Sequence, residues 1–150
     1  MSFVAILMGS TSDMDVMRKA EATLDEFGVV SEVNVRSAHR QPGALLDYIR
    51  DAESRDVGVF ICGAGMSAAL PGVVAAHTTK PVIGVPLESG GLGGLDALLS
   101  VAQMPPRVPV ACVAVGGAVN AALLAVQILA NADEGLAERF AEFKGRQAET

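Results

Sequence analysis

The stretch that decides the fold is Phe3-Val4-Ala5-Ile6-Leu7-Met8, followed directly by Gly9-Ser10-Thr11-Ser12-Asp13. Six consecutive apolar residues that end at a glycine are typical of a strand covered by helices on both faces. Apolar residues then recur at spacings of three and four over residues 13–27, which predicts an amphipathic helix that ends at Gly28. A buried strand, a polar turn and a helix form the first unit of a parallel α/β sheet.

The same unit recurs along the chain. We expect strands at residues 29–35, 57–62, 82–85 and 108–115, helices at residues 42–54, 68–77, 95–102 and 119–131, and a charged helical tail over residues 133–147. This alternation predicts an α/β, flavodoxin-like three-layer α/β/α sandwich with a five-stranded, or slightly larger, parallel sheet. The order 2-1-3-4-5 is usual for this class, although strand order is not readable from the sequence. The chain is interpreted as a single domain over residues 1–150, with the tail from about residue 133.

Composition narrows the class of function. The formal net charge is −6, which argues against general nucleic-acid binding because that needs a basic face. One bound phosphate needs only a few backbone N–H groups and an Arg, so it stays possible. No apolar run is long enough to span a membrane. The N-terminus lacks the basic segment of a signal peptide, so a cytoplasmic location is expected.

Two features of the apolar residues bear on assembly and metal binding. Cys62 and Cys112 both end strand-like runs, and we interpret them as small buried hydrophobes rather than a disulfide or a metal pair. No Cys/His cluster exists, so no metal site is expected. The helix over residues 119–130 has almost no polar face, and a chain of this size has little room to bury it. Subunit contact is the simplest solution; the alternative is that the charged tail covers the helix.

The most informative polar segment is Ser37-Ala38-His39-Arg40, which leaves the carboxyl end of the second expected strand. Open parallel sheets place their ligand sites at this end of the strands. The imidazole of His39 can transfer protons near neutral pH, and the guanidinium of Arg40 has a fork of donors that suits a phosphate. The alternative is a helix N-cap by Ser37 with a surface His and Arg after it. This segment alone leaves both interpretations open.

Three further loops are expected at the same edge. Residues 9–13 can cradle a phosphate with backbone N–H groups and a helix dipole, although a plain N-cap by Ser12 or Asp13 explains them too. The small residues 63–69 either let a ligand approach the backbone or let a helix pack tightly on the sheet. Residues 89–94 contain four glycines in six positions, which predicts a mobile lid or a backbone surface pressed against a ligand.

Taken together, this edge offers hydroxyls, one Arg, one Asp, one His and exposed backbone amides. The sequence pattern contains no metal ligands, no cysteine nucleophile and no Ser–His–Asp triad. Such a set suits a phosphorylated, sugar-containing substrate and a reaction limited by proton transfer. The second histidine, His77, falls at the end of a helix away from these loops and is interpreted as structural.

An ordered series of motifs points to a family. It comprises Met8-Gly9-Ser10-Thr11-Ser12-Asp13, Ser37-Ala38-His39-Arg40, Gly63-Ala64-Gly65, Gly84-Val85-Pro86, Leu98-Leu99-Ser100-Val101-Ala102-Gln103-Met104-Pro105, Val108-Pro109-Val110 and Asn120-Ala121-Ala122-Leu123-Leu124-Ala125. From about residue 3 to residue 133 the chain closely resembles the PurE family, the N5-carboxyaminoimidazole ribonucleotide mutases of de novo purine biosynthesis. No single motif is decisive, but the ordered set is highly specific.

The resemblance implies a flavodoxin-like fold, a homo-octamer, and neither a metal nor an organic cofactor. It implies an isomerase that moves a carboxylate from the exocyclic nitrogen of the imidazole to ring carbon C4, through loss and recapture of CO2. His39 matches the histidine that shuttles the proton. Ser12, Ser37 and Arg40 match positions that hold the substrate phosphate, and Asp13 matches the ribose-binding carboxylate. The full expected substrate-binding set is Gly9, Ser10, Ser12, Asp13, Ser37, Ala38, Arg40, Gly63, Ala64, Gly65, Ser67 and Leu92.

The chemistry agrees with these roles. After C4 attacks CO2 that carbon still bears a hydrogen, so rearomatisation needs a base within hydrogen-bond reach, and neutral His39 can supply it. The pocket must also retain CO2, which favours small apolar walls and the exclusion of water. Residues 63–69 and the loop around Gly91 can supply such walls, and we expect that loop to close over the substrate.

One segment departs from the family pattern. Many mutases read Gly-Gly-Ala-Ala-His-Leu-Pro where this chain reads Gly65-Met66-Ser67-Ala68-Ala69-Leu70-Pro71, so a second histidine is replaced by Ala69. The aminoimidazole ribonucleotide carboxylases, which use free CO2, also lack that histidine. They tend to have Ser-Ala-His-Lys and a different third loop, however. Arg40, residues 70–72 and residues 103–105 favour the mutase branch.

Other classes stay as alternatives. A non-catalytic flavodoxin-like nucleotide-binding protein would have a similar first loop, but a bound flavin usually has aromatic walls, and Tyr48 is the only Tyr in a chain without Trp. The residues around Gly65 and Leu70 also resemble a pyridine-dinucleotide carboxylase, which would not account for residues 37–40 and 103–105 together. A purely structural oligomer leaves the polar, glycine-rich edge unexplained.

Overall fold

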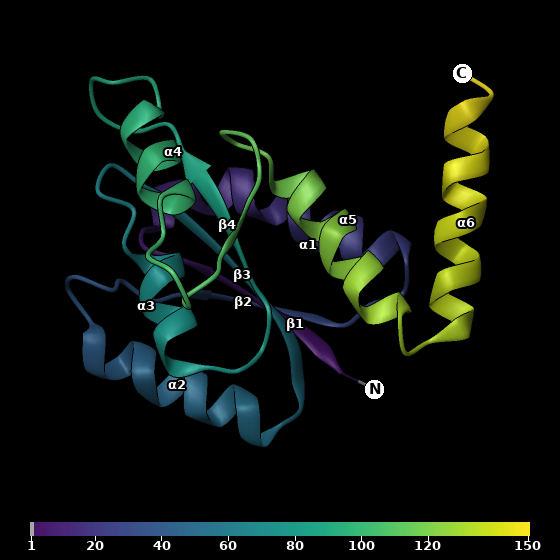
Figure 1. The fold of residues 1–150 in the computed structure, drawn as a ribbon, viewed down its shortest axis with the longest axis horizontal. Helices are drawn as coiled ribbons and strands as arrows, with labels where there is room; N and C mark the ends of the chain where they lie inside the picture. Colours follow the sequence, from purple (N-terminus) through teal and green to yellow (C-terminus); the bar gives the residue numbers. More distant parts are fainter. Residues whose placement is uncertain (1) are drawn as a thin grey trace.

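The computed structural model describes residues 2–150 and has three layers, with a sheet between two layers of helices (Figure 1). Five parallel strands lie in the order β2-β1-β3-β4-β5. The strands are β1 (Phe3–Met8), β2 (Ser31–Val35), β3 (Val57–Gly65), β4 (Val82–Leu87) and β5 (Ala111–Cys112). The flavodoxin-like class and the strand order usual for it are both confirmed.

Helices cover both faces of the sheet. One face carries α1 (Met14–Glu26) and α5 (Ala118–Ala130), and the other carries α2 (Pro42–Ser54), α3 (Leu70–His77) and α4 (Leu95–Ala102). A 3₁₀ turn (Thr11–Asp13) joins β1 to α1, and α6 (Glu134–Ala148) follows α5. Because all strands run in the same direction, their carboxyl ends meet at one edge of the sheet.

Strand β1 shows how the sequence divides the core. Its six residues are all buried, and successive side chains point to opposite faces of the sheet. Alternate residues from Val4 pack with α1 and α5, whereas alternate residues from Phe3 pack with α2, α3 and α4. An uninterrupted apolar run is therefore what this position requires, as the sequence predicts.

Several boundaries differ from those expected. Strand β3 does not stop at Cys62 but continues to Gly65, because its small last residues pair with β4 as far as Leu87. Strand β4 consequently includes Pro86, whose carbonyl accepts a hydrogen bond from the Gly116 N–H at 2.8 Å. Only two residues of the expected fifth strand join the sheet. That strand lies at the edge, where a preceding Pro109 can donate no ladder hydrogen bond.

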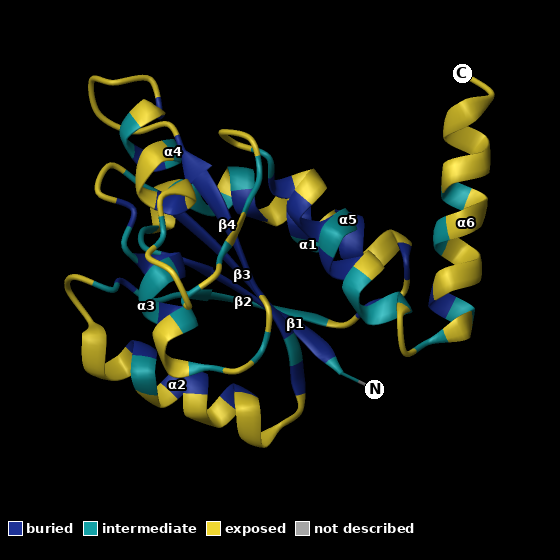
Figure 2. Ribbon diagram, in the orientation of Figure 1, coloured by how far each residue is buried: buried dark blue, intermediate teal, exposed yellow. Residues whose placement is uncertain are grey.

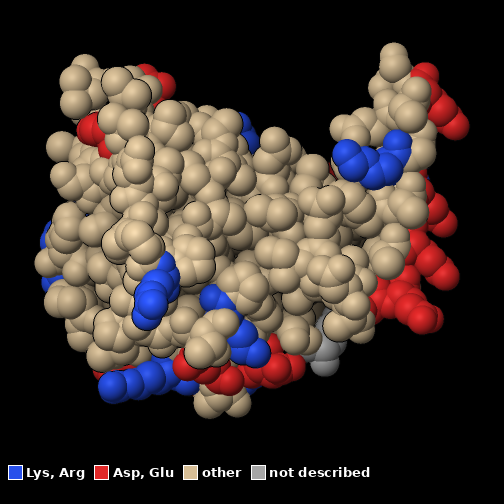
Figure 3. All heavy atoms as spheres, in the orientation of Figure 1, with Lys and Arg blue, Asp and Glu red and all other residues tan. Residues whose placement is uncertain are grey.

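Helix α6 is attached to the body through a few contacts and is otherwise mostly exposed (Figure 2). The Asp133 carboxylate caps its first turn by accepting from a backbone N–H at 2.9 Å. The Arg139 Nε donates to the Phe27 carbonyl at 3.0 Å, and the Phe140 and Phe143 rings lie 5.8 and 5.5 Å from the Phe27 ring. The acidic side chains of α6 gather on its side that faces away from the body (Figure 3). The expected charged, helical tail is confirmed.

Neither cysteine is in a disulfide. Cys62 is buried in β3 and Cys112 is half-buried in β5, so the interpretation of Cys62 as a buried small hydrophobe is confirmed. Burial raises the pKa of both thiols, which keeps them protonated and apolar. Over residues 2–150, no helix has the length and hydropathy needed to cross a membrane.

Candidate active site

A cavity of about 630 Å³ lies at the carboxyl edge of the sheet, a size typical of small-molecule sites. Its walls come from the segments after β1, β2 and β4 and from the end of β3 with the residues after it, so the topology and not the sequence order brings them together. The lining residues are Gly9, Ser10, Ser12, Asp13, Ser37, Ala38, His39, Arg40, Ala64, Gly65, Met66, Ser67, Ala68, Ala69, Leu70 and Ser89. All but two of the site residues expected from the sequence are among them.

The two exceptions are Gly63 and Leu92. Gly63 faces α1, where a Cβ atom would lie 2.4 Å from the Met17 sulfur, so this glycine makes room for the helix and not for a ligand. Leu92 lies outside the cavity lining, on the glycine-rich loop, with 66% of its surface exposed. Tight helix–sheet packing, the alternative considered for residues 63–69, therefore explains the first glycine of that segment.

The first loop is held by Ser10. Its hydroxyl accepts from the Ser12 N–H at 3.3 Å and from the Ser12 hydroxyl at 2.9 Å, so Ser10 is the N-cap of the 3₁₀ turn. Asp13 is the N-cap residue of α1, as one interpretation predicts, but its side chain makes no capping hydrogen bond; Ser12 does not occupy that position. The Asp13 carboxylate is therefore free to accept from a ligand. Burial raises its pKa, while the Ser10 backbone N–H and the nearby Arg40 charge oppose that rise.

The second loop is tied to the first through Arg40. The buried Ser37 hydroxyl accepts from the Arg40 backbone N–H at 3.1 Å and from its Nε at 3.3 Å. The Arg40 Nη2 donates to the Gly9 carbonyl at 2.9 Å. The N-cap of α2 is Gln41, so the alternative in which Ser37 caps that helix is wrong. Because both lone pairs of the Ser37 oxygen are in use, its own O–H remains available to a ligand.

His39 lies in an exposed turn between these anchored residues and lines the cavity. Its imidazole makes no hydrogen bond to any part of the chain that the structure describes. The other histidine, His77, is exposed at the last residue of α3, which ends at the opposite edge of the sheet. His39 is therefore the imidazole that borders this cavity, and proton transfer is the chemistry that the cavity can perform. Within residues 2–150, no cluster of His, Cys, Asp or Glu could hold a metal ion.

Comparison with known proteins identifies a family to which this chain is similar. The family model for AIR carboxylase matches residues 3–150. The N5-carboxyaminoimidazole ribonucleotide mutase of Mycobacterium leprae is 51% identical over 147 residues, which cover 98% of this chain and 86% of that protein. The enzyme of the same name from Bacillus subtilis is 50% identical over 149 residues, covering 98% of this chain and 92% of its own.

The chain belongs to the AIR carboxylase family. The crystal structure of Treponema denticola PurE superimposes with a TM-score of 0.92 at 30% identity, covering 99% of this chain and 93% of that one. The resemblance inferred from the ordered motifs is thereby confirmed, and the chain is an enzyme of this family.

The substrate-binding set expected from the sequence omits five lining residues of this AIR carboxylase family member. They are Met66, Ala68, Ala69, Leu70 and Ser89. Met66, Ala68 and Ala69 belong to the segment of residues 63–69 that was expected to form a pocket wall, and Leu70 follows that segment directly. Ser89 begins the glycine-rich loop of residues 89–94 and lines the cavity where β4 approaches β3. A Cβ atom on Gly65 would lie 2.8 Å from the Ser89 Cβ.

The glycine-rich loop of residues 89–94 has a structural requirement for most of its glycines. Gly90, Gly93 and Gly94 have positive φ angles of 72°, 62° and 85°, which glycine adopts without strain. A Cβ atom on Gly94 would also lie 2.7 Å from Val115. Backbone conformation and close packing thus account for three of the four glycines, and the loop borders the cavity through Ser89 alone.

Proposed function

We propose that this chain is an N5-carboxyaminoimidazole ribonucleotide mutase, which converts its substrate (N5-CAIR) into 4-carboxy-5-aminoimidazole ribonucleotide (CAIR) in purine biosynthesis. The observation that carries the proposal is the cavity itself, in which one free imidazole lies among hydroxyl, guanidinium and carboxylate groups. The identity of about one half to mutases over nearly the whole chain supports the same reaction. Because these relatives are named as mutases, the enzyme class is an isomerase.

The substrate phosphate would bind between the first two loops. Arg40 is already fixed there by the Gly9 carbonyl and the Ser37 hydroxyl, so little side-chain entropy is lost when a phosphate arrives. The Ser12 hydroxyl would add a further donor from the first loop. The Asp13 carboxylate would accept hydrogen bonds from the ribose, since no cap contact uses it. These roles leave the imidazole ring of the substrate to face His39.

His39 would carry the proton in both halves of the reaction. Its imidazolium form protonates the exocyclic nitrogen as the carbamate loses CO2, which leaves aminoimidazole ribonucleotide and neutral His39. Carbon C4 then attacks CO2, and neutral His39 removes the C4 hydrogen as the ring regains aromaticity. The proton is returned to His39, so the cycle balances without another acid or base.

The cavity walls suit the retention of CO2. Ala64, Ala68, Ala69 and Leu70 supply small apolar surface, so the gas has no polar group to hydrate it on that side. Ala69 occupies the position at which many mutases of the family have a second histidine. An aminoimidazole ribonucleotide carboxylase that uses free CO2 is the second candidate function, and Ala69 is the observation that favours it.

We also propose that the enzyme forms a homo-octamer in the cytoplasm. Support comes from α5 and α4, which keep large apolar side chains at the surface. Val119 is 44% exposed, and Leu95 and Leu99 are 56% and 52% exposed. Helix α6 does not cover α5 completely, since Leu123, Leu124 and Ile128 are only partly buried. Light scattering on the purified protein would test the stoichiometry, and a monomer would contradict it.

A product assay tests the reaction. Fresh N5-CAIR in CO2-depleted buffer is compared with aminoimidazole ribonucleotide plus bicarbonate, and CAIR is measured in both. We expect rapid CAIR formation from N5-CAIR alone. Turnover of the second substrate only, rising with added CO2, would assign the carboxylase reaction instead. Absence of product from both would refute the proposed function.

A further inference from the structure

Met66 has an unusual backbone conformation within the cavity wall. Its φ angle is +54°, in the left-handed region that side chains other than those of Gly, Asn and Asp rarely adopt. A strained residue persists only where the surrounding structure or its function requires it. Met66 therefore needs an explanation beyond the path of the chain.

The side chain of Met66 lies against the glycine-rich loop. A Cβ atom built on Gly90 would lie 3.7, 3.8 and 3.9 Å from the Met66 Cγ, Cε and Sδ atoms, which is ordinary contact distance. One residue earlier in each segment, Gly65 and Ser89 approach so closely that no Cβ fits on Gly65. The end of β3 and the start of the glycine-rich loop thus lie close together at two successive positions, of which the second, Met66, lies beyond the last strand pairing.

Met66 is at the same time a cavity-wall residue and is 56% exposed. About half of this large apolar side chain is therefore exposed beside the cavity, and that surface could be buried against another part of the protein. Methionine is unbranched and flexible, so its thioether can follow a moving neighbour and fill an irregular gap. Gly90 provides such a neighbour, since the next residue, Gly91, has neither a positive φ angle nor a close neighbour that would fix its conformation.

We propose that Met66 is the docking contact for residues 89–94 when this loop closes over the substrate, and that it seals the cavity against escape of CO2. This inference rests on the proposed function, because it assigns a residue to the retention step of that reaction. Met66 supplies the bulk that Ala69 lacks at the same wall of the cavity.

The test compares two substitutions at one position. Met66→Gly removes the sealing side chain and relieves the backbone strain, so it should not lower the melting temperature. Met66→Leu keeps the apolar bulk and the strain. The measured quantity is the amount of aminoimidazole ribonucleotide released per CAIR formed from N5-CAIR in CO2-depleted buffer, after subtraction of the enzyme-free decay of N5-CAIR.

We expect Met66→Gly to release about tenfold more aminoimidazole ribonucleotide per CAIR than the wild type, since burial of a side chain of this size shifts an equilibrium by at least that factor. The product ratio is the readout, so it tests the sealing role whatever the rate at which Met66→Gly consumes N5-CAIR. Met66→Leu should restore coupling. If Met66→Gly has the wild-type product ratio, the sealing role is wrong while the mutase function stands. If the wild type consumes no N5-CAIR, the proposed function fails and this inference fails with it.

Discussion

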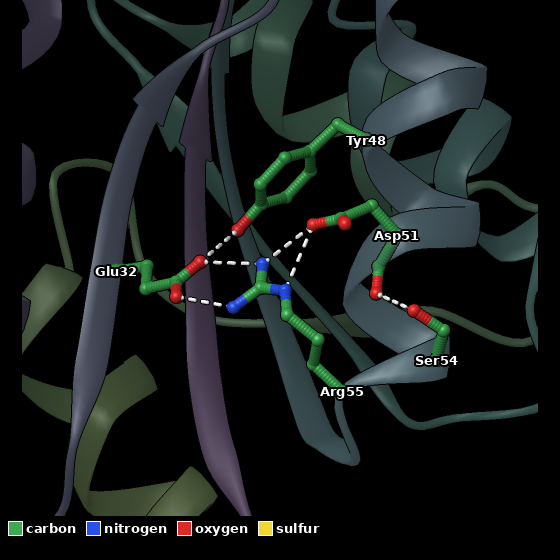
Figure 4. A network of polar contacts seen from close by, with 5 residues as sticks. All are labelled: Glu32, Tyr48, Asp51, Ser54 and Arg55. Carbon is green, nitrogen blue, oxygen red and sulfur yellow. Dashed lines mark hydrogen bonds and ion pairs between the residues drawn. The ribbon is translucent and has the colours of Figure 1, made fainter.

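The two edges of the sheet use their polar side chains in opposite ways. At the amino edge, Arg55 at the end of α2 bonds the Glu32 carboxylate of β2 through both terminal nitrogens, and its Nε donates to Asp51 at 2.8 Å (Figure 4). The Tyr48 hydroxyl donates to the same Glu32 at 3.1 Å, and the guanidinium stacks 4.9 Å from the Phe3 ring centroid. Every charged side chain in this network has a partner, and these contacts hold α2 against the sheet.

At the carboxyl edge, by contrast, several polar groups could form hydrogen bonds that no other residue in the described part of the chain uses. The Asp13 carboxylate caps no helix, the His39 imidazole has no partner within residues 2–150, and the Ser37 hydroxyl still has its proton to donate. The shifts in pKa follow the same division. Hydrogen bonds from Arg55 lower the pKa of Glu32, whereas burial dominates at Asp13 and raises its pKa. A network in which every polar group has a partner stabilises the structure. Polar groups that border a cavity without partners can instead form hydrogen bonds with a ligand.

The largest effect expected from this contrast is on turnover. His39→Asn removes the proton carrier but leaves a polar side chain in an exposed turn, so the fold and assembly should be unchanged. We expect the rate of CAIR formation to fall by about 10²–10⁴-fold, the usual value of general acid–base catalysis. His77→Asn is the matched control and should keep wild-type activity. A His39→Asn enzyme that retained more than about a tenth of the wild-type rate would contradict the role of His39.

The next effect is on substrate binding. Arg40→Leu removes the proposed phosphate contact, and loss of a hydrogen bond to a charged group costs about 1.5–3 kcal/mol, equivalent to a KM about 10- to 100-fold higher. Steady-state kinetics with N5-CAIR measure this change. Arg36→Leu serves as control, because Arg36 belongs to the same loop but does not line the cavity. An unchanged KM for Arg40→Leu, or equal changes in both variants, would refute the phosphate role.

A third substitution separates packing from binding within one glycine-rich segment. Gly63→Ala places a methyl group 2.4 Å from the sulfur of the fully buried Met17, and such overpacking typically costs about 1–3 kcal/mol. Denaturant unfolding would measure the loss. Gly43→Ala is the control, since a Cβ there has no neighbour within 4 Å and α2 is helical at that position. Equal stability of the two variants would mean that Gly63 has another role.

The sequence predicts best where one physical constraint dominates. Helices α2 and α4 have the expected bounds, because Pro42 marks one start, Gly94 precedes the other, and apolar periodicity covers the rest. The site could be predicted to a similar extent, since parallel strands bring their carboxyl ends together whatever lies between them. The motifs after β1 and β2 thus converge on one cavity, as expected.

The contacts between loops could not be predicted from the sequence. Gly63 and Gly65 look alike in the sequence and, two residues apart on β3, face the same side of the sheet. A Cβ atom on Gly63 would nevertheless meet Met17 of α1, whereas one on Gly65, farther along the strand, would meet Ser89. The small residues 63–65 suggested a break, whereas burial between two strands keeps them extended. The positive φ angle of Met66 was equally invisible, since nothing local favours it.

The smallest effect expected is at the saturated amino edge. Glu32→Gln removes the carboxylate that pairs with Arg55, and since this pair is substantially exposed to solvent the loss should be about 0.5–1 kcal/mol at neutral pH. The pKa of Glu32 is lowered in the folded state, so its stabilisation is present above the ordinary value of 4.5. It is lost as the pH falls through the folded-state pKa, where both states become protonated.

Unfolding experiments on the wild type and Glu32→Gln should therefore give a free-energy difference at pH 7 that shrinks to nothing in acid. Glu21→Gln is the control, because its pairing with Arg18 is a single exposed contact of 3.4 Å. A difference for Glu32→Gln that persisted in acid would mean that shape and hydrogen bonding to Tyr48 hold this edge, and not charge. Activity should be unchanged in both variants, since the amino edge lies across the sheet from the cavity. A loss of activity in Glu32→Gln would show that the two edges are coupled, and the contrast between them would then fail.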